Sequence, residues 1–269
     1  MIINCNCSFF SNLINSQISI VSWNIQNMGK TKDSIEIDYM SKKILDYDII
    51  AIQEISTSHY GEDAIVNLIN SLEFNSKFNW KYVLSEKTSG SGTEKYAFIY
   101  KADIIKILYD PTLAKNVEME ISREPYLSTF FNNKGDTVTL VNFHAIPNSR
   151  DKDPRTEIVL LDKIYEEYNS YPMVFMGDFN LKESDNAYDN LKNIGFKSSL
   201  KDKKTSLKTK CKDGNCMSHE YDNFYYDSNF LELNNSYVLY FFKDFNDIIE
   251  ARKISDHCPI VIILKSKDI

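Results

Sequence analysis

Short apolar runs recur from one end of the chain to the other, and this pattern limits the folds open to it more than any other feature. Several of these runs are continuous rather than alternating, as is expected of strands that are covered on both faces of a sheet. The clearest of them are Ile18–Trp23, Asp48–Ile52, Tyr96–Tyr100, Thr137–His144, Met173–Met176 and Pro259–Leu264. The chain is therefore predicted to contain buried strands along its whole length.

Helical patterns lie between these runs, and no internal repeat or linker rich in Pro, Gly or Ser divides the chain. Helices interspersed among buried strands argue for one α/β domain of layered sheets. We expect this domain to span residues 18–269, after an N-terminal extension of residues 1–17. The predicted helices are Ile35–Leu45, Asp63–Leu72, a segment that begins at Asp153-Pro154, and Ala187–Ile194.

The charge balance restricts the partners of the chain. A net charge of -7 argues against a generic nucleic-acid coat protein. It leaves open an enzyme that acts on phosphate esters, because a divalent cation or a local cluster of Lys or Arg can supply the positive field. No run reaches the ~18 apolar residues of a membrane span.

Cysteine content and the first residues bear on the compartment. The number of cysteines, five, is odd and does not describe a disulfide framework. Cys211 and Cys216 flank a small loop and could pair in an oxidising compartment or remain thiols, and their spacing does not favour zinc. Residues 1–16 lack a basic segment before an apolar core. The cytoplasm is therefore expected, with secretion as the alternative if a leader was removed.

Polar clusters lie at the ends of five apolar runs. Each holds a carboxylate, an amide or an imidazole, the side chains that ligate hard cations and move protons. Four clusters follow a strand-like run and the fifth precedes one, so all would meet at one sheet edge if the last strand ran antiparallel to the others. The clusters are Ser22-Trp23-Asn24-Ile25-Gln26-Asn27, Ile52-Gln53-Glu54, Asn142-Phe143-His144, Gly177-Asp178-Phe179-Asn180 and Ser255-Asp256-His257.

Glu54 follows the apolar run Ile49–Ile52 directly, so the chain leaves a predicted buried strand and presents a carboxylate. Mg²⁺ prefers oxygen ligands of this kind and keeps several of its waters. The alternative is a strand-end glutamate that faces solvent or pairs with a lysine.

Asp178 and Asn180 lie on a predicted tight turn, where Gly177 gives the backbone freedom to bend. A carboxylate and an amide two residues apart can position a water and a phosphate oxygen together. An ordinary Asx-rich turn is the alternative, because it explains most sequences of this kind.

His144 and His257 place imidazoles at two strand ends. Hydrolysis of a phosphodiester needs a proton removed from water and charge stabilised on the leaving oxygen, and two histidines can serve both needs. Either histidine alone could instead be a hydrogen-bonded structural residue. The combination with the carboxylates favours catalysis.

The order of these motifs resembles that of the endonuclease/exonuclease/phosphatase superfamily, over about residues 18–264. The segments that carry the resemblance are Trp23-Asn24-Ile25, Ile52-Gln53-Glu54, Gly177-Asp178-Phe179-Asn180 and Ser255-Asp256-His257. Further segments are similar to the deoxyribonuclease I branch, namely Glu94-Lys95-Tyr96-Ala97-Phe98, Ser122-Arg123-Glu124-Pro125 and Tyr221-Asp222.

The resemblance implies a four-layer α-β-β-α sandwich and an endonuclease that hydrolyses phosphodiesters with Mg²⁺ or Mn²⁺, with Ca²⁺ as a further structural ion. It implies a nucleic-acid substrate, DNA above all, and a monomer. Glu54 would be the principal metal ligand, aided by Asn24 and Asp256. Asn180 would bind a phosphate oxygen, and Arg123 would contact a backbone phosphate.

The same resemblance implies roles for the histidines and their partners. His257, held by Asp222, would act beside the attacked phosphate. His144, held by Glu94, would serve the opposite side of the reaction, and Asp178 would orient or activate the water. How acid and base divide between the two histidines stays open.

Two segments bear on how DNA would be bound. Gly92 stands where deoxyribonuclease I relatives often carry a tyrosine that packs in the minor groove, so the resemblance does not by itself imply minor-groove binding of a duplex. Lys201–Lys212 contains six lysines in twelve residues. This segment could follow a nucleic-acid backbone, or it could be a solvated, mobile loop.

Other functions remain open at this point. A superfamily phosphatase or phospholipase could act on inositol phosphates or sphingomyelin, although Tyr221-Asp222-Asn223 lacks the Trp-Cys-Asp-Arg run of the inositol polyphosphate phosphatases. An abasic-site endonuclease is a further alternative, although Glu54 is followed by Ile55-Ser56 rather than Thr-Lys. A catalytically dead binding protein would have lost a metal or histidine position, and every such position is present.

Overall fold

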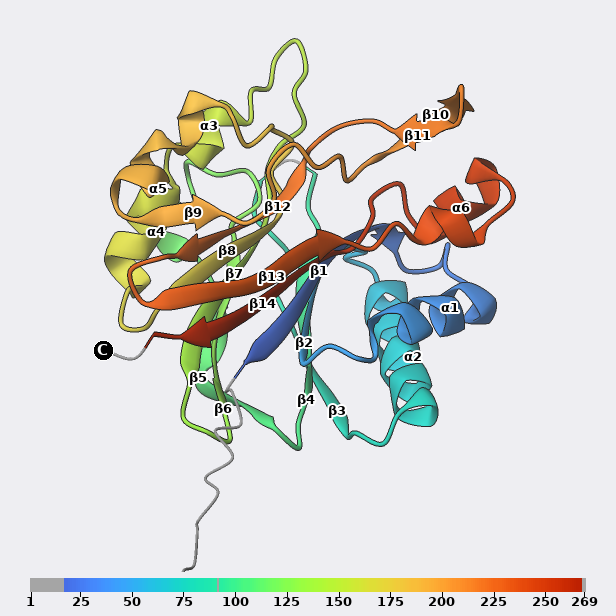
Figure 1. Cartoon of the computed structure of the whole chain (residues 1–269), viewed down its shortest axis with the longest axis horizontal. Coiled ribbons are helices and arrows are strands. Elements are labelled where there is room, and N and C mark those ends of the chain that lie inside the picture. Colours follow the sequence, from blue (N-terminus) through green and yellow to red (C-terminus); the bar gives the residue numbers. More distant parts are fainter. Residues whose placement is uncertain (1–16, 91, 268–269) are drawn as a thin grey trace, which may run out of the picture.

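The computed structural model describes residues 17–90 and 92–267. Two six-stranded sheets lie against each other, with helices on their outer faces (Figure 1). One core fills the space between the sheets and beneath α1 (Ser34–Ile44) and α2 (His59–Asn75). A second core lies beneath the helices on the other side, α3 (Arg155–Ile158), α4 (Leu161–Tyr168) and α5 (Asp189–Asn193). The layers follow the order α-β-β-α, so the predicted fold class is confirmed.

The first sheet has the strand order β13-β14-β1-β2-β4-β3. β1 runs parallel to β2 and antiparallel to β14. The last strand therefore has the antiparallel direction that the polar clusters need in order to meet at one edge. β4 is antiparallel to β2, so the start of β4 lies at the same edge as the end of β2. The bounds are β1 (Ile18–Met28), β2 (Ile49–Ile55), β3 (Trp80–Leu84), β4 (Lys95–Lys101), β13 (Leu231–Val238) and β14 (Ile260–Ser266).

The second sheet has the order β5-β6-β7-β8-β12-β9. β7 and β8 are parallel and place His144 opposite Asp178, while the antiparallel β12 places Asp222 opposite Asp178. The predicted site therefore lies where the edges of two stacked sheets meet, and not on the edge of one sheet. The bounds are β5 (Ile105–Leu113), β6 (Tyr126–Asn132), β7 (Thr137–His144), β8 (Met173–Asp178), β9 (Phe196–Ser198) and β12 (Asp222–Asp227).

Helix ends follow local capping chemistry where it is present. Asp33 caps α1 by accepting from the backbone N–H groups of Ile35 and Glu36, and Glu36 returns a bond to the Asp33 N–H. The helix predicted from Asp153-Pro154 is interrupted, because the carbonyl of Val159 accepts from the side chain of Asn190. That carbonyl is therefore used outside the helix, and α3 and α4 are separate.

A small hairpin, β10 (Leu207–Lys212) and β11 (Asn215–Met217), stands apart from both sheets. Its turn is Asp213-Gly214, with φ of 50° and 75°, and Asp-Gly is a strong hairpin signal that could have predicted it from sequence. Cys211 and Cys216 face each other across the hairpin and form a disulfide. Of the two states left open for these cysteines, paired or free, the structure therefore shows the paired one.

Three features complete the fold. Helix α6 (Ile248–Ile254) precedes β14 and carries the segment that leads to Asp256. Among the described helices, none is both long and apolar enough to cross a membrane. Apart from Gln17, the predicted extension lies outside the described residues, so its boundary stays a prediction.

Candidate active site

The end of β1 is bulged, and the bulge turns Asn24 towards acids from both sheets. Gln26 and Asn27 have left-handed φ of 45° and 61°, at the point where the pairing of β1 with β2 shifts register. The buried Asn24 accepts from the Gln26 N–H at 3.0 Å, and its Nδ2 donates to Glu54 at 3.0 Å and to Asp178 at 3.1 Å. This amide therefore connects the two sheets.

Glu54 lies on a second irregularity, between Ile52 and Ile55 in the pairing of β2 with β4. Its φ of 59° is uncommon for a residue other than glycine and turns the side chain out of the strand. Its Oε2 accepts from the Asn27 N–H at 3.1 Å, and 27% of the side chain is exposed. No Lys or Arg among residues 17–90 and 92–267 forms an ion pair with it. The alternative of a lysine-paired glutamate is therefore not seen.

His144 ends β7 and is buried against Glu94, which immediately precedes β4. Nδ1 of His144 and Nη1 of Arg123 lie 2.9 Å and 3.1 Å from the same oxygen, Oε2 of Glu94. Burial opposes a charge on the imidazole, but the Glu94 carboxylate outweighs it and raises the pKa of His144. Burial also favours the neutral form of Glu94, but His144 and Arg123 together lower the pKa of Glu94.

Arg123 is buried rather than extended into solvent. Its Nη2 donates to the carbonyl of Ala145 and its Nη1 to Glu94, so both terminal nitrogens are used inside the protein. The buried carboxylate of Glu157 on α3 accepts from the N–H groups of Ser122 and Ile146, at 2.8 Å each, and joins the Arg123 loop to the chain after β7. Sequence reasoning missed Glu157, because nothing in its helical pattern marks it.

Asp178 depends on Gly177 for its position. Gly177 has φ of 134°, and a Cβ there would lie 1.9 Å from the carbonyl oxygen of Phe143, so only glycine lets β7 and β8 approach this closely. Asn180, with φ of 49°, donates its N–H to Asp178 at 2.9 Å and its side-chain amide to Ala145 at 3.0 Å. Residues 178–180 thus form an Asx turn, the alternative considered from the sequence, and the side chains of this turn also lie in the candidate site.

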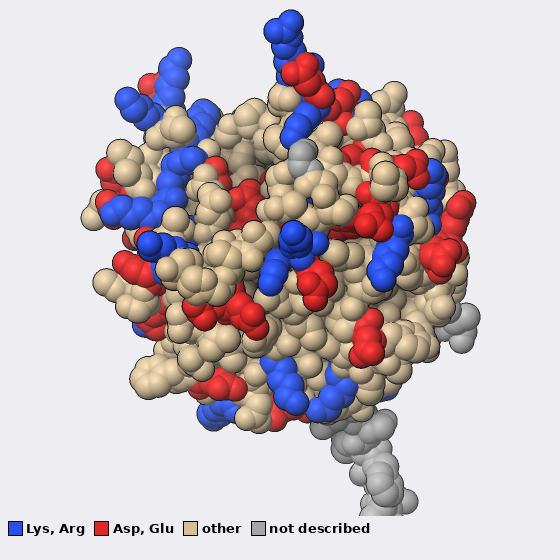
Figure 2. All heavy atoms as spheres, turned by 180° about the vertical axis from the view of Figure 1, so that it is seen from behind, with Lys and Arg blue, Asp and Glu red and all other residues tan. Residues whose placement is uncertain are grey.

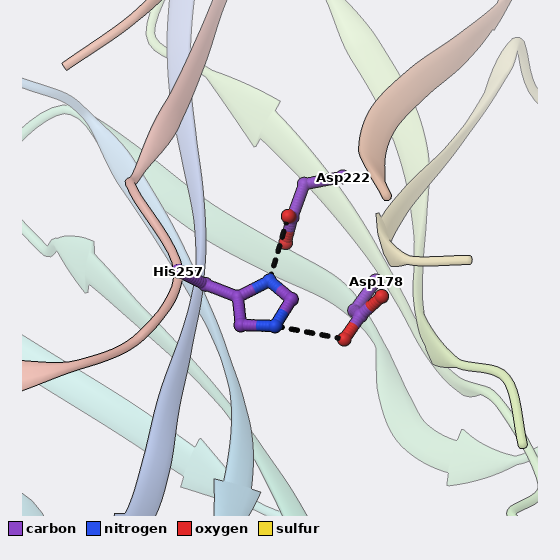
Figure 3. A group of neighbouring side chains, drawn as sticks. All are labelled: Asp178, Asp222 and His257. Carbon is purple, nitrogen blue, oxygen red and sulfur yellow. Dashed lines mark hydrogen bonds and ion pairs between the residues drawn. The ribbon is translucent and has the colours of Figure 1, made fainter. Parts of the chain in front are cut away.

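His257 lies between two carboxylates, as Figure 3 shows. Nδ1 is 2.7 Å from Oδ2 of Asp222, and Nε2 is 3.5 Å from Oδ2 of Asp178. Nε2 of His144 is also 3.5 Å from that Asp178 oxygen. The chain therefore places one buried acid between two imidazoles, each with its own carboxylate behind it.

The charges of this group support one another. Burial opposes protonation of His257, but Asp222 and Asp178 outweigh it and raise its pKa to about 10. Burial likewise opposes ionisation of Asp178, but the two imidazoles hold the pKa of Asp178 below its ordinary value. In the protein without bound ions, His257 is therefore cationic and Asp178 anionic at neutral pH.

Asp256 lies at the rim of the site and is connected to it through Gln26. It accepts from Gln26 Nε2 at 3.0 Å and from Arg252 at 3.3 Å. Sequence reasoning missed both partners. Gln26 lies inside the first polar cluster, and Arg252 precedes Asp256 by four residues, which is a spacing typical of side-chain pairs.

The donor atoms fit a hard divalent cation. Glu54, Asp256 and Asn24 offer the carboxylate and amide oxygens that Mg²⁺ and Ca²⁺ prefer. Asp178, Asp222 and His257 also place ligand atoms within 4.8 Å of one another. The Asp222–His257 pair, however, already shares a hydrogen bond at 2.7 Å. Glu54, by contrast, has 27% of its side chain exposed and forms no ion pair with a Lys or Arg of the described residues.

A groove with a volume of about 580 Å³ opens beside Glu54 and Glu94. The buried Arg123 and the exposed Lys30 both line it. Gly92 belongs to the same wall, and a Cβ built there would meet nothing within 4 Å. The groove is therefore open at the position where the resembling branch often has tyrosine.

A four-layer sandwich whose joined edges hold paired carboxylates and imidazoles is the arrangement of a hydrolase of phosphate esters. The chain belongs to the Endonuclease/Exonuclease/phosphatase family, whose model matches residues 21–257. This membership confirms the family resemblance seen in the motifs, and enzymes of this family are metal-dependent.

The chain is similar to Deoxyribonuclease-1 of Mus musculus, with 29% identity over 173 residues. This match covers 61% of the chain and 60% of the relative, so the chain spans about three fifths of the length of that protein.

Solved structures show the same fold. One is an endonuclease/exonuclease/phosphatase family protein from Leptotrichia buccalis C-1013-b, with a TM-score of 0.67 and 21% identity, covering 93% of this chain and 100% of that one. Another is a mannosyl-6-phosphatase of Bacteroides thetaiotaomicron VPI-5482, with a TM-score of 0.66 and 15% identity, covering 92% and 99%.

Proposed function

We propose that this chain is a divalent-metal-dependent endonuclease that hydrolyses the phosphodiester bonds of DNA. The observation that carries the proposal is the position of Asp178, whose Oδ2 lies 3.5 Å from Nε2 of both His144 and His257. Glu94 and Asp222 lie behind the two imidazoles. Diester hydrolysis needs two proton transfers at neutral pH, and two such imidazoles can supply them.

The reaction moves two protons and exchanges one bond at phosphorus. Water forms a new P–O bond while the bond to the sugar oxygen breaks on the opposite side. Asp178 orients the water, and the imidazole nearer the water, in its neutral form, accepts the one proton that the water loses. The other imidazole, in its protonated form, donates a proton to the departing oxygen. Glu94 and Asp222 hold the Nδ1–H of each ring, so that Nε2 faces the reacting atoms.

Charge on the phosphate is the second requirement. A bound divalent cation supplies positive charge at the phosphate oxygens, and Glu54, Asn24 and Asp256 are the residues proposed to hold it. Asn180 is proposed to bind a phosphate oxygen through its amide. Arg123 lines the groove and is proposed to contact a flanking phosphate. Its guanidinium would then interact with both that phosphate and the Glu94 carboxylate.

DNA is proposed as the substrate because the sequence similarity is to a deoxyribonuclease, over three fifths of that relative. A phosphatase is the main competing activity, since one structural neighbour is a mannosyl-6-phosphatase. The Cys211–Cys216 disulfide favours an oxidising compartment over the cytoplasm, because reducing compartments keep such pairs as thiols.

The test is incubation with supercoiled plasmid, and separately with a soluble phosphate monoester, in Mg²⁺ and in EDTA. The proposal predicts nicking that needs the ion and is lost in His144→Ala and in His257→Ala. His59→Ala is the matched control, because His59 is exposed at the start of α2, contacts the ring of Tyr60 and lies outside the network. Release of inorganic phosphate from the monoester, without plasmid nicking, would support the phosphatase instead.

A further inference from the structure

Residues 201–217 form a strongly basic projection, which we call the basic arm. It contains the six lysines of the segment Lys201–Lys212 and only two acids, Asp202 and Asp213. Five of these lysines are exposed and Lys208 is half-buried. Within the described part of the chain, none of the six forms an ion pair. Figure 2, turned by half a turn from Figure 1, shows Lys and Arg side chains gathered at the upper left, where the hairpin projects.

The root of the arm is bound to the site itself. Leu207 donates its N–H to the carbonyl of Asp256 at 2.7 Å, and Ser206 pairs with His257. The hydroxyl of the buried Thr205 accepts from the N–H of Asp222 at 3.0 Å. The arm therefore begins within hydrogen-bonding distance of the Asp256–His257 segment and of the strand that carries Asp222.

A disulfide and a tight turn cross-link the tip of the basic arm. A hairpin of two short strands is only marginally stable by itself in water. Here the Asp213-Gly214 turn and the Cys211–Cys216 disulfide join the two strands at the tip, next to Lys210 and Lys212. Four uncompensated positive charges are thus held on an ordered arm, on a protein whose net charge is -7.

We infer that the basic arm binds the DNA backbone beside the scissile phosphate and supplies much of the affinity of this enzyme for long substrates. The inference rests on the proposed endonuclease function. Glu54, Lys30 and Gly92 line the groove, and no residue of the basic arm does. The arm and the groove would therefore hold different parts of the strand that carries the reacting phosphate.

Counterion release makes this binding measurable. Each phosphate neutralised by a lysine contributes about -0.9 to the slope of log K against log salt for duplex DNA. The double variant Lys210→Gln/Lys212→Gln should therefore make the slope shallower by about 1.8, which, extrapolated from 1 M salt, weakens binding about sixtyfold at 0.1 M salt. The control Lys77→Gln/Lys81→Gln removes the same charge from two exposed positions, one before β3 and one within it, and should leave the slope unchanged.

The experiment uses full-length protein carrying His144→Ala/His257→Ala, so that a fluorescent duplex is not cut, and follows anisotropy in Mg²⁺ from 0.05 to 0.3 M salt. An unchanged slope in the Lys210/Lys212 variant, or an equal loss in the Lys77/Lys81 control, would overturn the inference. Thermal unfolding of each variant shows that it is folded. Plasmid nicking by the wild-type chain separates the endonuclease proposal from the inference about the basic arm. If the wild-type chain nicks plasmid but the Lys210/Lys212 variant keeps the slope, only DNA binding by the arm is refuted.

The disulfide provides a second variant that keeps all six lysines. Cys211→Ser/Cys216→Ser opens the tip but leaves the charge of the arm unaltered. We expect the slope to persist and the affinity to fall about threefold, because an unclosed tip must be ordered on binding. A shallower slope in this variant would contradict the view that the lysines bind and the disulfide only orders them.

Discussion

His144 and His257 face the same oxygen atom, Oδ2 of Asp178, and the Nε2 atom of each lies 3.5 Å from it. His144 ends β7 of the second sheet, His257 precedes β14 of the first sheet, and the two are 113 residues apart in the chain. The stacking of the sheets therefore creates a symmetric relationship around Asp178 that neither strand contains alone.

Removing the central charge tests this relationship. Asp178→Asn keeps the shape of the side chain but takes away the carboxylate that both imidazoles contact. We expect plasmid nicking to slow by about 10²- to 10⁴-fold, the range typical of a lost general acid or base. Initial rates measure the effect, and Asp189→Asn, on an exposed helix, is the control. A rate within threefold of wild type would exclude a central role for Asp178.

The raised pKa of His257 makes folding stability depend on pH. Asp222, Asp178 and Asp256 raise it from 6.5 to about 10, so the folded protein holds a proton that the unfolded chain has lost. This contribution to stability is complete below pH 6.5 and is lost as the pH rises through about 10. Urea unfolding in EDTA at several pH values measures it. In Asp222→Asn, the free energy of unfolding should fall less steeply as the pH rises. An equally steep fall in that variant would show that other groups cause the pH dependence.

Comparing two glycines with positive φ separates the energetic cost of lost close packing from the cost of backbone strain. A Cβ at Gly177 would lie 1.9 Å from the Phe143 carbonyl, whereas one at Gly135 would meet nothing within 4 Å. Gly135→Ala should cost about 1 kcal/mol, from φ alone. Gly177→Ala should cost about 3 kcal/mol or more, because β7 and β8 must also separate. Chemical denaturation measures both values, and equal costs would contradict the close approach.

Binding of a divalent ion should be visible without substrate. An ion present at 100 times its Kd stabilises the folded protein by about 2.7 kcal/mol, so Mg²⁺ or Ca²⁺ should raise the Tm. Glu54→Gln should remove most of this shift, since the amide no longer offers a charged ligand. Glu118→Gln, an exposed change of the same kind, should keep it. If both variants retain the full shift, Glu54 is not the principal ligand.

Six of the fourteen described strands and most of the site residues could be predicted from local patterns. A continuous apolar run marks β8 at Met173–Met176, because burial on both faces leaves no alternation, and the strand extends to Asp178. Edge and outer strands such as β5 and β13 were missed, since their exposed residues interrupt the pattern. The hairpin was missed although Asp213-Gly214 signalled it. Glu157 could not be found, because its partners, Ser122 and Ile146, lie in two other segments of the chain.

The amino-acid sequence by itself determined which side chains stand at the strand ends, because strand periodicity and turn chemistry act over a few neighbouring residues. Only the tertiary structure decided which of them touch. The Asn24–Asp178 bond joins residues 154 apart, and it exists because two sheets pack in one register. The left-handed backbone of Glu54 likewise depends on strands on either side of it. Contacts of this range follow from the stacking of whole sheets, which no local pattern encodes.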